Sequence, residues 1–232
     1  SDKLEKSKRL NRIPKVLIPV HFAGQPCNMP AIYKLSKKYG FKIIEDASHA
    51  IGARYNNIKV GSCKHSEITI FSFHPVKIIT SGEGGMILTN DKKIFEKLLR
   101  LRTNGITNKQ KFMNLNNIED EQVWNYQQIE LGFNFRLTDI QAALGINQLK
   151  RLNKFIKERR KIALFYDKNL KNLPLTLPKQ LTENYSSYHL YPVLLKKNSL
   201  NLTQKKFINL LKQNKIYVNL HYPPVHLQPF YR

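Results

Sequence analysis

Short apolar runs of strand length alternate with amphipathic stretches near the start of the chain. Residues 16–20 read V-L-I-P-V, residues 29–39 carry apolar side chains at helical spacing, and residues 41–44 form a second apolar run that ends in Glu45 and Asp46. A strand, a helix and a strand within about thirty residues are typical of a βαβ unit with parallel strands. Because ligands bind beyond the carboxyl ends of such strands, Asp46 lies at a candidate site.

Polar residues and glycines mark where the helices begin and end. Asn28 is a suitable N-cap for the first amphipathic helix, and Gly40 is a suitable stop. Asp91 begins a second helix that runs through Arg102. Apolar positions at near-helical spacing then predict one long helix over about residues 140–170, a length typical of a helix that joins two subdomains.

The stretch from Ile68 to Gly85 carries the strongest candidate chemistry. Residues 68–73 read I-T-I-F-S-F and predict a buried strand, which Pro75 stops from pairing further. Lys77 follows in a turn, and a desolvated lysine at such a place is a candidate Schiff-base nucleophile. The alternative is an ordinary surface lysine. Three glycines that allow close approach of a ligand precede the next short strand, namely Gly82, Gly84 and Gly85.

The pattern changes in the second half of the chain. Residues 103–128 are polar and too long for an ordinary loop, so they are a candidate insertion or lid. Short strands are predicted over residues 188–195 and 216–220, with a helix over residues 203–213 between them. We therefore expect two domains, a partial large domain over residues 1–148 and a partial small α+β domain over residues 149–232.

Composition narrows the class of protein. The 232 residues are 41% hydrophobic, which supports a packed core, and no apolar run approaches the roughly 20 residues of a membrane span. The net charge of +23 permits binding to nucleic acid, but the lysines are spread along the chain without a basic stripe or a recognition motif. Cys27 and Cys63 are too few for a disulfide framework and too far apart for a zinc knuckle. We expect a cytoplasmic protein with no metal and no membrane or nucleic-acid partner.

Four residues near the predicted strand ends suggest a pyridoxal phosphate site. Asp46 is suited to keeping a pyridine nitrogen protonated, and His49 in the same turn can reach the ring hydroxyl. Ser72 is suited to holding a phosphate, and Lys77 to forming the Schiff base with the cofactor. Each residue also has an ordinary interpretation, such as a turn cap or a satisfied buried histidine, and the pattern by itself leaves both interpretations open.

Four blocks of sequence carry a resemblance to a known family. In chain order they are I-P-V-H-F-A-G-Q-P-C-N-M, I-I-E-D-A-S-H-A-I-G-A, F-S-F-H-P-V-K-I-I-T-S-G-E-G-G and L-G-F-N-F-R-L-T-D-I-Q-A-A-L-G. Together they resemble the sugar aminotransferases of the DegT/DnrJ/EryC/StrS family, over about residues 16–232. The resemblance implies the α/β fold of the pyridoxal-phosphate-dependent transferases of fold type I (aspartate aminotransferase-like), a mostly parallel sheet with helices on both faces. The combination of K-V-L-I-P-V-H-F-A-G-Q, F-S-F-H-P-V-K and the closing H-Y-P-P-V-H-L-Q-P-F-Y-R is most similar to a branch of this family that acts on the route to pseudaminic acid.

The resemblance also implies roles for individual residues. Lys77 would be the Schiff-base lysine, Asp46 the partner of the pyridinium, His49 the neighbour of the ring hydroxyl and Ser72 a phosphate ligand. Two further residues, Asn134 and Arg136, would reach the cofactor of the neighbouring subunit in a homodimer. The amino group would pass from glutamate to a UDP-linked 4-keto-6-deoxy amino sugar. Some members with a histidine in place of the lysine are dehydratases, so Lys77 favours transamination.

The length of the chain differs from that of the family. Members carry further residues before Val16, including a phosphate-binding turn and several strands of the large sheet, and further helices at the end. We therefore expect an internal fragment or the product of a split gene, inactive alone or in need of a partner chain. A remnant without its own function and a basic nucleic-acid-binding protein are the alternatives.

Overall fold

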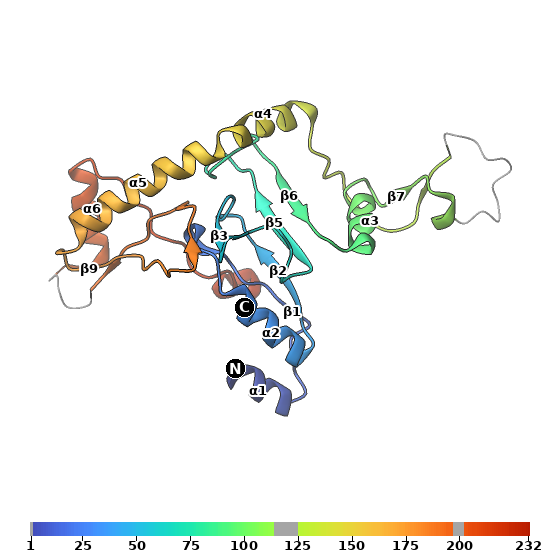
Figure 1. Ribbon diagram of the computed structural model, residues 1–232, viewed down its shortest axis with the longest axis horizontal. Coiled ribbons are helices and arrows are strands. Elements are labelled where there is room, and N and C mark those ends of the chain that lie inside the picture. The colour runs from blue at the N-terminus through green and yellow to red at the C-terminus, as the bar shows by residue number, and fades with distance from the viewer. Residues whose placement is uncertain (1, 114–124, 197–201) are drawn as a thin grey trace. The chain divides into compact units, whose positions relative to one another are not determined.

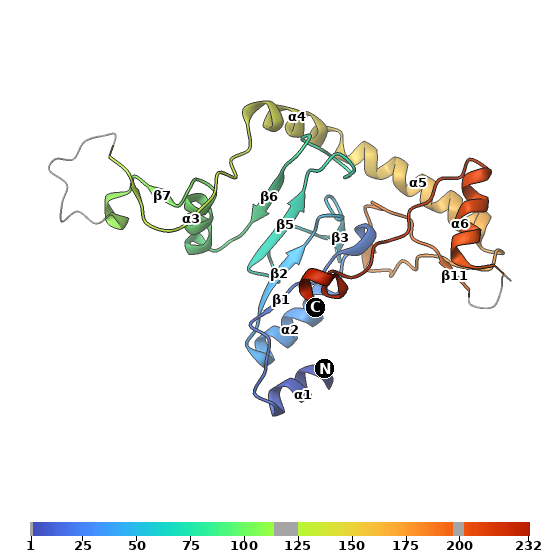
Figure 2. The same cartoon turned by 180° about the vertical axis from the view of Figure 1, so that it is seen from behind.

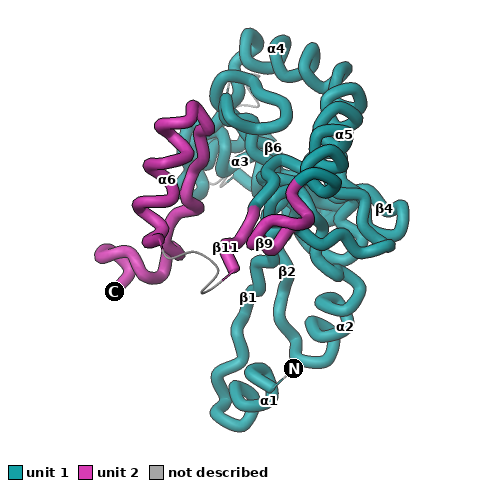
Figure 3. The backbone as a smooth tube through the Cα atoms, turned by 90° about the vertical axis from the view of Figure 1, so that its left-hand side faces the viewer, with its two compact units in different colours: residues 1–169, 178–192 teal, residues 170–177, 193–232 magenta. Residues whose placement is uncertain are grey.

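The computed structural model describes residues 2–113, 125–196 and 202–232. Contacts within the chain divide it into two compact units (Figure 3). Unit 1 comprises residues 1–169 and 178–192, and unit 2 comprises residues 170–177 and 193–232. The predicted candidate site lies entirely in unit 1. The predicted boundary between residues 148 and 149 falls inside unit 1, and the assignment of a large and a small domain stays a prediction.

A four-stranded sheet forms the centre of unit 1, and Figure 1 and Figure 2 show its strands from opposite sides. Its strands lie in the order β1-β2-β5-β6. The pairs β1–β2 and β2–β5 are parallel, and β6 pairs antiparallel with β5. The bounds are Val16–Leu17 for β1, Lys42–Asp46 for β2, Ile68–Ser72 for β5 and Gly85–Leu88 for β6. Strand β1 is shorter than predicted because Pro19 has no N–H to donate, and pairing resumes only as an isolated bridge between Val20 and Asp46.

Helix α2 (Met29–Tyr39) connects β1 to β2 and confirms the predicted βαβ unit. The side chain of Asn28 accepts a hydrogen bond from the backbone N–H of Ala31 at 3.1 Å, as an N-cap does. Gly40 ends the helix in the left-handed conformation, with φ 80°. One hydrophobic core cluster joins the helix to β2 through the buried side chains of Met29, Tyr39, Phe41 and Ile43.

A second core cluster lies beside β5. It contains the buried residues Ala47, Ala50, Ala53 and Phe71. A small antiparallel sheet in the same unit has the strand order β10-β3-β4. Its strands are β3 (Arg54–Tyr55), β4 (Ile58–Lys59) and β10 (Asn184–Tyr185). The pairing of β10 with β3 brings a segment from late in the chain onto the turn that follows β2.

Helix α3 begins where the sequence predicts. The carboxylate of Asp91 accepts hydrogen bonds from the backbone N–H groups of Lys93 (2.7 Å) and Ile94 (3.1 Å), and the helix spans Lys92–Leu101. Within the described part of the predicted insertion, the strands β7 (Ile106–Thr107) and β8 (Gln127–Gln128) pair antiparallel. Residues 114–124 lie outside the described residues, so the lid hypothesis stays untested.

The predicted long helix is two helices that meet at one residue. Helix α4 spans Asp139–Lys150 and helix α5 spans Leu152–Leu170. Arg151 between them has φ −97° and ψ −1°, and its N–H turns back to the carbonyls of Gln148 and Leu149. Helix α5 buries Ile156 and Ala163, and its first turns pack against Gly52 of the turn after β2.

Two predicted strands are wrong. Tyr188 has φ 46°, which an extended strand does not allow, and only Leu194–Leu195 of the predicted residues 188–195 form a strand, β11. Residues 216–220 form no strand, because no described segment pairs with them and side chains such as Ile216 stay exposed. The predicted helix is confirmed as α6 (Gln204–Gln213), and β9 (Leu175–Thr176) pairs with β11 inside unit 2.

The remaining helices are short and lie near the ends of the chain or in loops. Helix α1 spans Asp2–Arg9, and 3-10 turns cover Phe22–Gly24, Gln110–Phe112, Val225–Leu227 and Pro229–Tyr231. Among the described residues, no helix combines the length and the apolar character that a bilayer crossing demands.

Candidate active site

The carboxyl ends of β2 and β5 bring the predicted cofactor residues to one edge of the sheet. Asp46 is the last residue of β2 and pairs in register with Ile70 of β5. Ser72 ends β5, and Lys77 follows it in the next turn. Because β2 and β5 are parallel neighbours, Asp46, Ser72 and Lys77 lie beyond the same ends of adjacent strands.

Backbone hydrogen bonds hold Asp46 from both sides. Its N–H donates to the carbonyl of Pro19 at 3.0 Å, and its own carbonyl accepts from the N–H of His21 at 3.0 Å. The carboxylate accepts from the N–H of Ser48 at 3.0 Å. The side chain is half-buried, so one turn residue fixes its direction while part of it stays accessible.

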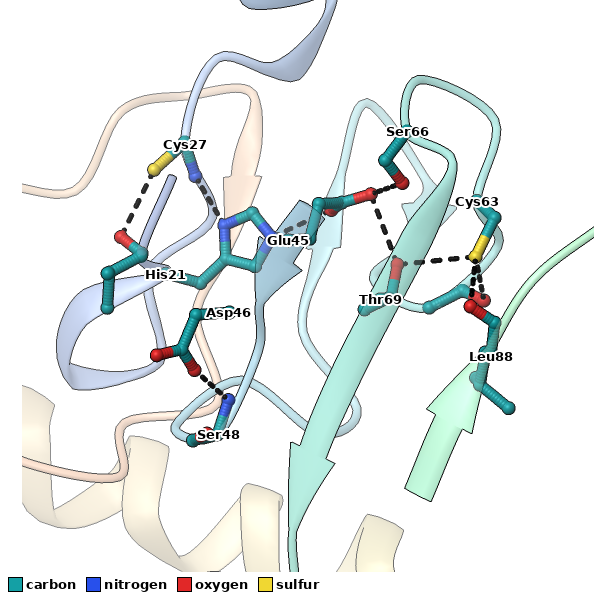
Figure 4. A network of polar contacts seen from close by, with 11 residues as sticks. His21, Cys27, Glu45, Asp46, Ser48, Cys63, Ser66, Thr69 and Leu88 are labelled. Atoms are coloured by element: carbon teal, nitrogen blue, oxygen red, sulfur yellow. Dashed lines mark hydrogen bonds and ion pairs between the residues drawn. The ribbon is translucent and has the colours of Figure 1, made fainter. Parts of the chain in front are cut away.

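A buried polar network is centred on Glu45, the residue before Asp46 (Figure 4). The Nε2 of His21 is 2.8 Å from the carboxylate of Glu45, and His21 is fully buried. The same carboxylate accepts hydrogen bonds from the hydroxyls of Ser66 and Thr69, the latter at 3.2 Å. The network therefore ties the loop after β1 to β2 and β5, at the residue that precedes Asp46.

The charges of this buried pair are coupled. Burial lowers the pKa of His21, but the hydrogen bonds with Cys27 and Glu45 outweigh burial and raise the pKa to about 9. Burial raises the pKa of Glu45, but the hydrogen bonds from His21 and Ser66 outweigh it, so the pKa of this carboxyl is lowered. The pair is thus a buried ion pair that ties the loop after β1 to the end of β2.

His49 has a fixed ring orientation. Its Nδ1 accepts a hydrogen bond from the N–H of Ala23 at 3.4 Å, which places the proton of the neutral ring on Nε2. Its carbonyl accepts from the hydroxyl of Ser187 at 3.2 Å. The ring centroid lies 4.4 Å from that of His189, with the two planes tilted by 45°. His49 therefore presents a ring donor from the turn that Asp46 begins.

The contacts of His49 with Ser187 and His189 belong to a docked segment that the sequence did not reveal. The N–H of Ser187 donates to the carbonyl of Gly24 at 3.0 Å, and the N–H of Leu190 donates to the carbonyl of Ala23 at 3.3 Å. Gly24 has φ 95°, and a Cβ there would lie 2.8 Å from the backbone nitrogen of Tyr188. Only glycine fits this close approach. The run of alternating apolar residues predicted a strand of the small domain, whereas residues 186–190 pack on the candidate site within unit 1.

The turn that carries Lys77 is closed by His74. The N–H of Lys77 donates to the carbonyl of His74 at 2.9 Å, and the N–H of Val76 donates to the Nδ1 of the His74 ring at 3.3 Å. The N–H of His74 in turn donates to the hydroxyl of Ser72 at 3.4 Å. Lys77 is half-buried, and within the described part of the chain its amine pairs with no carboxylate. The amine is thus available to a ligand.

Asn134 and Arg136 form a separate pair. The Nε of Arg136 donates to the side-chain oxygen of Asn134 at 2.9 Å, and both residues are exposed. Asn134 also forms an isolated antiparallel bridge with Thr103. No hydrogen bond among the described residues links either side chain to the group around Lys77, so their role at a neighbouring subunit's cofactor stays a prediction.

The residues present fit a pyridoxal phosphate cofactor. Such a cofactor needs an amine to bind its aldehyde, a carboxylate for its ring nitrogen, and donors for its hydroxyl and phosphate. The half-buried carboxylate of Asp46, the Nε2 of His49, the hydroxyl of Ser72 and the amine of Lys77 are groups of these kinds, and they lie at one edge of one sheet. When bound, the cofactor supplies an electron sink that lets an amino group be exchanged.

Comparison with known proteins agrees with this fit. The chain is 40% identical to the UDP-4-amino-4,6-dideoxy-N-acetyl-beta-L-altrosamine transaminase of Campylobacter jejuni over 214 residues, which is 92% of this chain and 53% of the relative. It superimposes on Helicobacter pylori PseC, an aminotransferase involved in the biosynthesis of pseudoaminic acid, with a TM-score of 0.80 and 33% identity over 95% of this chain and 55% of that one.

A third relative is the putative sugar aminotransferase Spr1654 from Streptococcus pneumoniae, solved in its PLP form. It matches with a TM-score of 0.78 and 26% identity over 94% of this chain and 57% of that one. The chain thus spans about half the length of the relatives that it matches. The model of the DegT/DnrJ/EryC1/StrS aminotransferase family matches residues 3–232, so the chain belongs to this family.

Proposed function

We propose that the protein is a pyridoxal-phosphate-dependent aminotransferase that moves an amino group from glutamate to a UDP-linked 4-keto-6-deoxy amino sugar. The observation that carries this proposal is the placement of Asp46 and Lys77 beyond the carboxyl ends of adjacent parallel strands, with His49 in the turn after Asp46. The choice of sugar is supported by the name of the Campylobacter jejuni relative, a UDP-4-amino-4,6-dideoxy-N-acetyl-beta-L-altrosamine transaminase. The product would enter nucleotide-sugar and surface-glycan biosynthesis, with pseudaminic acid as the first candidate route.

The residues divide the work. Lys77 would hold the cofactor and supply an amine that can carry a proton, Asp46 would hold the protonated ring nitrogen, and His49 would donate from Nε2 to the ring hydroxyl. Ser72 holds the phosphate. The exposed Asn134 and Arg136 serve a neighbouring subunit of a homodimer. We place the protein in the cytoplasm, where nucleotide sugars are made.

Absorbance titration with pyridoxal phosphate tests the cofactor site. We expect wild-type chain to develop a visible band on titration, and Lys77→Ala to lack the band. Lys97→Ala removes an exposed lysine of α3 and should behave as wild type. Asp46→Asn should weaken binding, because an amide does not keep the ring nitrogen protonated. Equal bands in Lys77→Ala and wild type would overturn the proposal.

Isotope transfer tests the reaction itself. With ¹⁵N-glutamate, the UDP-linked keto-sugar and a partner chain that supplies the rest of the relatives' length, mass spectrometry should find ¹⁵N in the sugar for wild type and none for Lys77→Ala. Incorporation of ¹⁵N into a different keto-sugar, and none into this one, would support the proposed aminotransferase activity but contradict the proposed substrate.

A further inference from the structure

His189 is a buried polar residue that none of the assigned roles uses. It is only 8% exposed, and its Nδ1 has no hydrogen-bond partner among the described residues. A buried nitrogen without a partner costs free energy, and a phenylalanine of similar shape would avoid the cost. A histidine at this position is therefore unfavourable for the folded chain alone, and a contact with a bound ligand would offset this cost.

The surroundings of His189 place it at the candidate cofactor site. Its ring packs on that of His49, with centroids 4.4 Å apart. Electrostatic interactions reach it from Lys77 in the turn after β5 and from Arg159 of α5. Arg159 also anchors the backbone, because its Nη1 donates to the carbonyls of Tyr188 and His189 at 3.1 Å each. The fixed backbone holds the ring against the site.

The same surroundings keep His189 uncharged. Burial is the largest cause, and electrostatic interactions with His49, Lys77 and Arg159 act in the same direction, so that the pKa of His189 is lowered to about 3. At neutral pH the ring is a neutral imidazole, which has one nitrogen that accepts and one that donates. Such a ring can make a hydrogen bond to a ligand without adding a charge beside Lys77.

We propose that His189 is a further ligand-binding residue of the site around Lys77, whose Nδ1, buried and without a partner among the described residues, makes a hydrogen bond to a polar group that arrives with the cofactor. This inference rests on the proposed function. The position was not predicted from the sequence, because His189 is more than a hundred residues from Lys77 and its segment was predicted as a strand of another domain.

The decisive variant is His189→Phe, because phenylalanine keeps a ring against His49 and removes both nitrogens. We expect this variant to fold with a melting temperature equal to or above that of wild type, since an unpartnered buried nitrogen is gone. We expect the concentration of pyridoxal phosphate that half-saturates Lys77, measured by borohydride trapping and mass spectrometry, to rise about tenfold, the effect of one lost hydrogen bond.

His65→Phe is the matched control. The Nδ1 of His65 is also buried and has no hydrogen-bond partner in the described part of the chain, but its ring packs on Tyr33, at a centroid distance of 5.4 Å. This variant should leave the half-saturating concentration unchanged. An unchanged value in His189→Phe as well would show that His189 only packs, and would overturn the inference while the proposed function stands.

Nuclear magnetic resonance of the ring nitrogens keeps the inference testable if His189→Phe fails to fold. In wild-type chain, adding pyridoxal phosphate should shift the ¹⁵N resonance of the His189 Nδ1 and leave those of His65 in place. No shift at His189 despite trapping at Lys77 would contradict the inference. Absence of trapping at Lys77 in wild type would instead remove the proposed function, and the inference with it.

Discussion

The strand end that holds Asp46 and the segment that holds Asn134 and Arg136 differ in how far this chain fixes their geometry. Asp46 is held by two backbone hydrogen bonds and backed by the buried pair of His21 and Glu45. Asn134 and Arg136 are exposed and hydrogen-bond to each other. Contacts within this chain already orient Asp46 toward a ligand. Asn134 and Arg136 are exposed, so only contact with a neighbouring subunit would orient them. The comparison predicts large effects at the first region and small ones at the second.

Removal of Glu45 should have the largest effect on stability. Glu45→Ala leaves fully buried His21 without its carboxylate and removes the acceptor of Ser66 and Thr69. Breaking a buried ion pair from one side lowers the free energy of unfolding by about 3–5 kcal/mol. Urea denaturation measures this. A loss as small as that of an exposed pair, such as Lys161 with Glu158, would show that the network does not stiffen the strand end.

The same pair makes stability depend on pH. The pKa of His21 rises from 6.5 to about 9 on folding, so its contribution is complete below pH 6.5 and disappears as the pH rises to about 9. The pKa of Glu45 falls from 4.5, so its contribution is complete above pH 4.5 and is lost as the pH falls further. The free energy of unfolding should therefore be highest between these ranges. In Glu45→Gln the decline from pH 6.5 to 9 should be much smaller, and an unchanged decline would assign it to other groups.

Gly24 tests the docked segment at residues 186–190. With φ 95° and a Cβ position 2.7 Å from the hydroxyl of Ser187, Gly24→Ala should lower the free energy of unfolding by about 1–3 kcal/mol and displace His189. Gly40→Ala is the control, since Gly40 has φ 80° but no atom within 4 Å of its Cβ position. For Gly40→Ala the free energy of unfolding should fall only by the strain of placing alanine in the left-handed conformation. Equal costs for the two variants would mean that the segment docks less closely than described.

Arg136→Ala should have the smallest effect on the chain itself. The free energy of unfolding should change by less than about 0.5 kcal/mol, because the side chain is exposed and its one partner, Asn134, is exposed too. A large loss of stability would show that this region is fixed as firmly as Asp46.

The sequence predicted the ends of the helices, which depend on local signals, but not the contacts between residues far apart in the chain. The caps at Asn28 and Asp91 and the stop at Gly40 depend on neighbouring backbone, so the sequence reveals them. His21 and Glu45 are 24 residues apart in the sequence. No local pattern links a histidine in a loop with a glutamate near a strand end, so their contact was not predicted.

The docked segment was missed for a different reason. The alternation of residues 188–195 is typical of a strand, but the left-handed conformation of Tyr188 and the hydrogen bonds to Ala23 and Gly24 place this segment against a loop instead. Neither feature leaves a local signal in the sequence. The strand over residues 216–220 was predicted from its alternating pattern, which cannot supply a partner strand.

The most direct test of the account is where pyridoxal phosphate attaches. Purified chain is incubated with a small excess of the cofactor, reduced with borohydride, digested and mapped by mass spectrometry over all lysines. The account predicts one dominant site, Lys77, and a marked loss of this adduct in Asp46→Asn. Labelling spread over exposed lysines, with Lys77 no more reactive than Lys97, would contradict it.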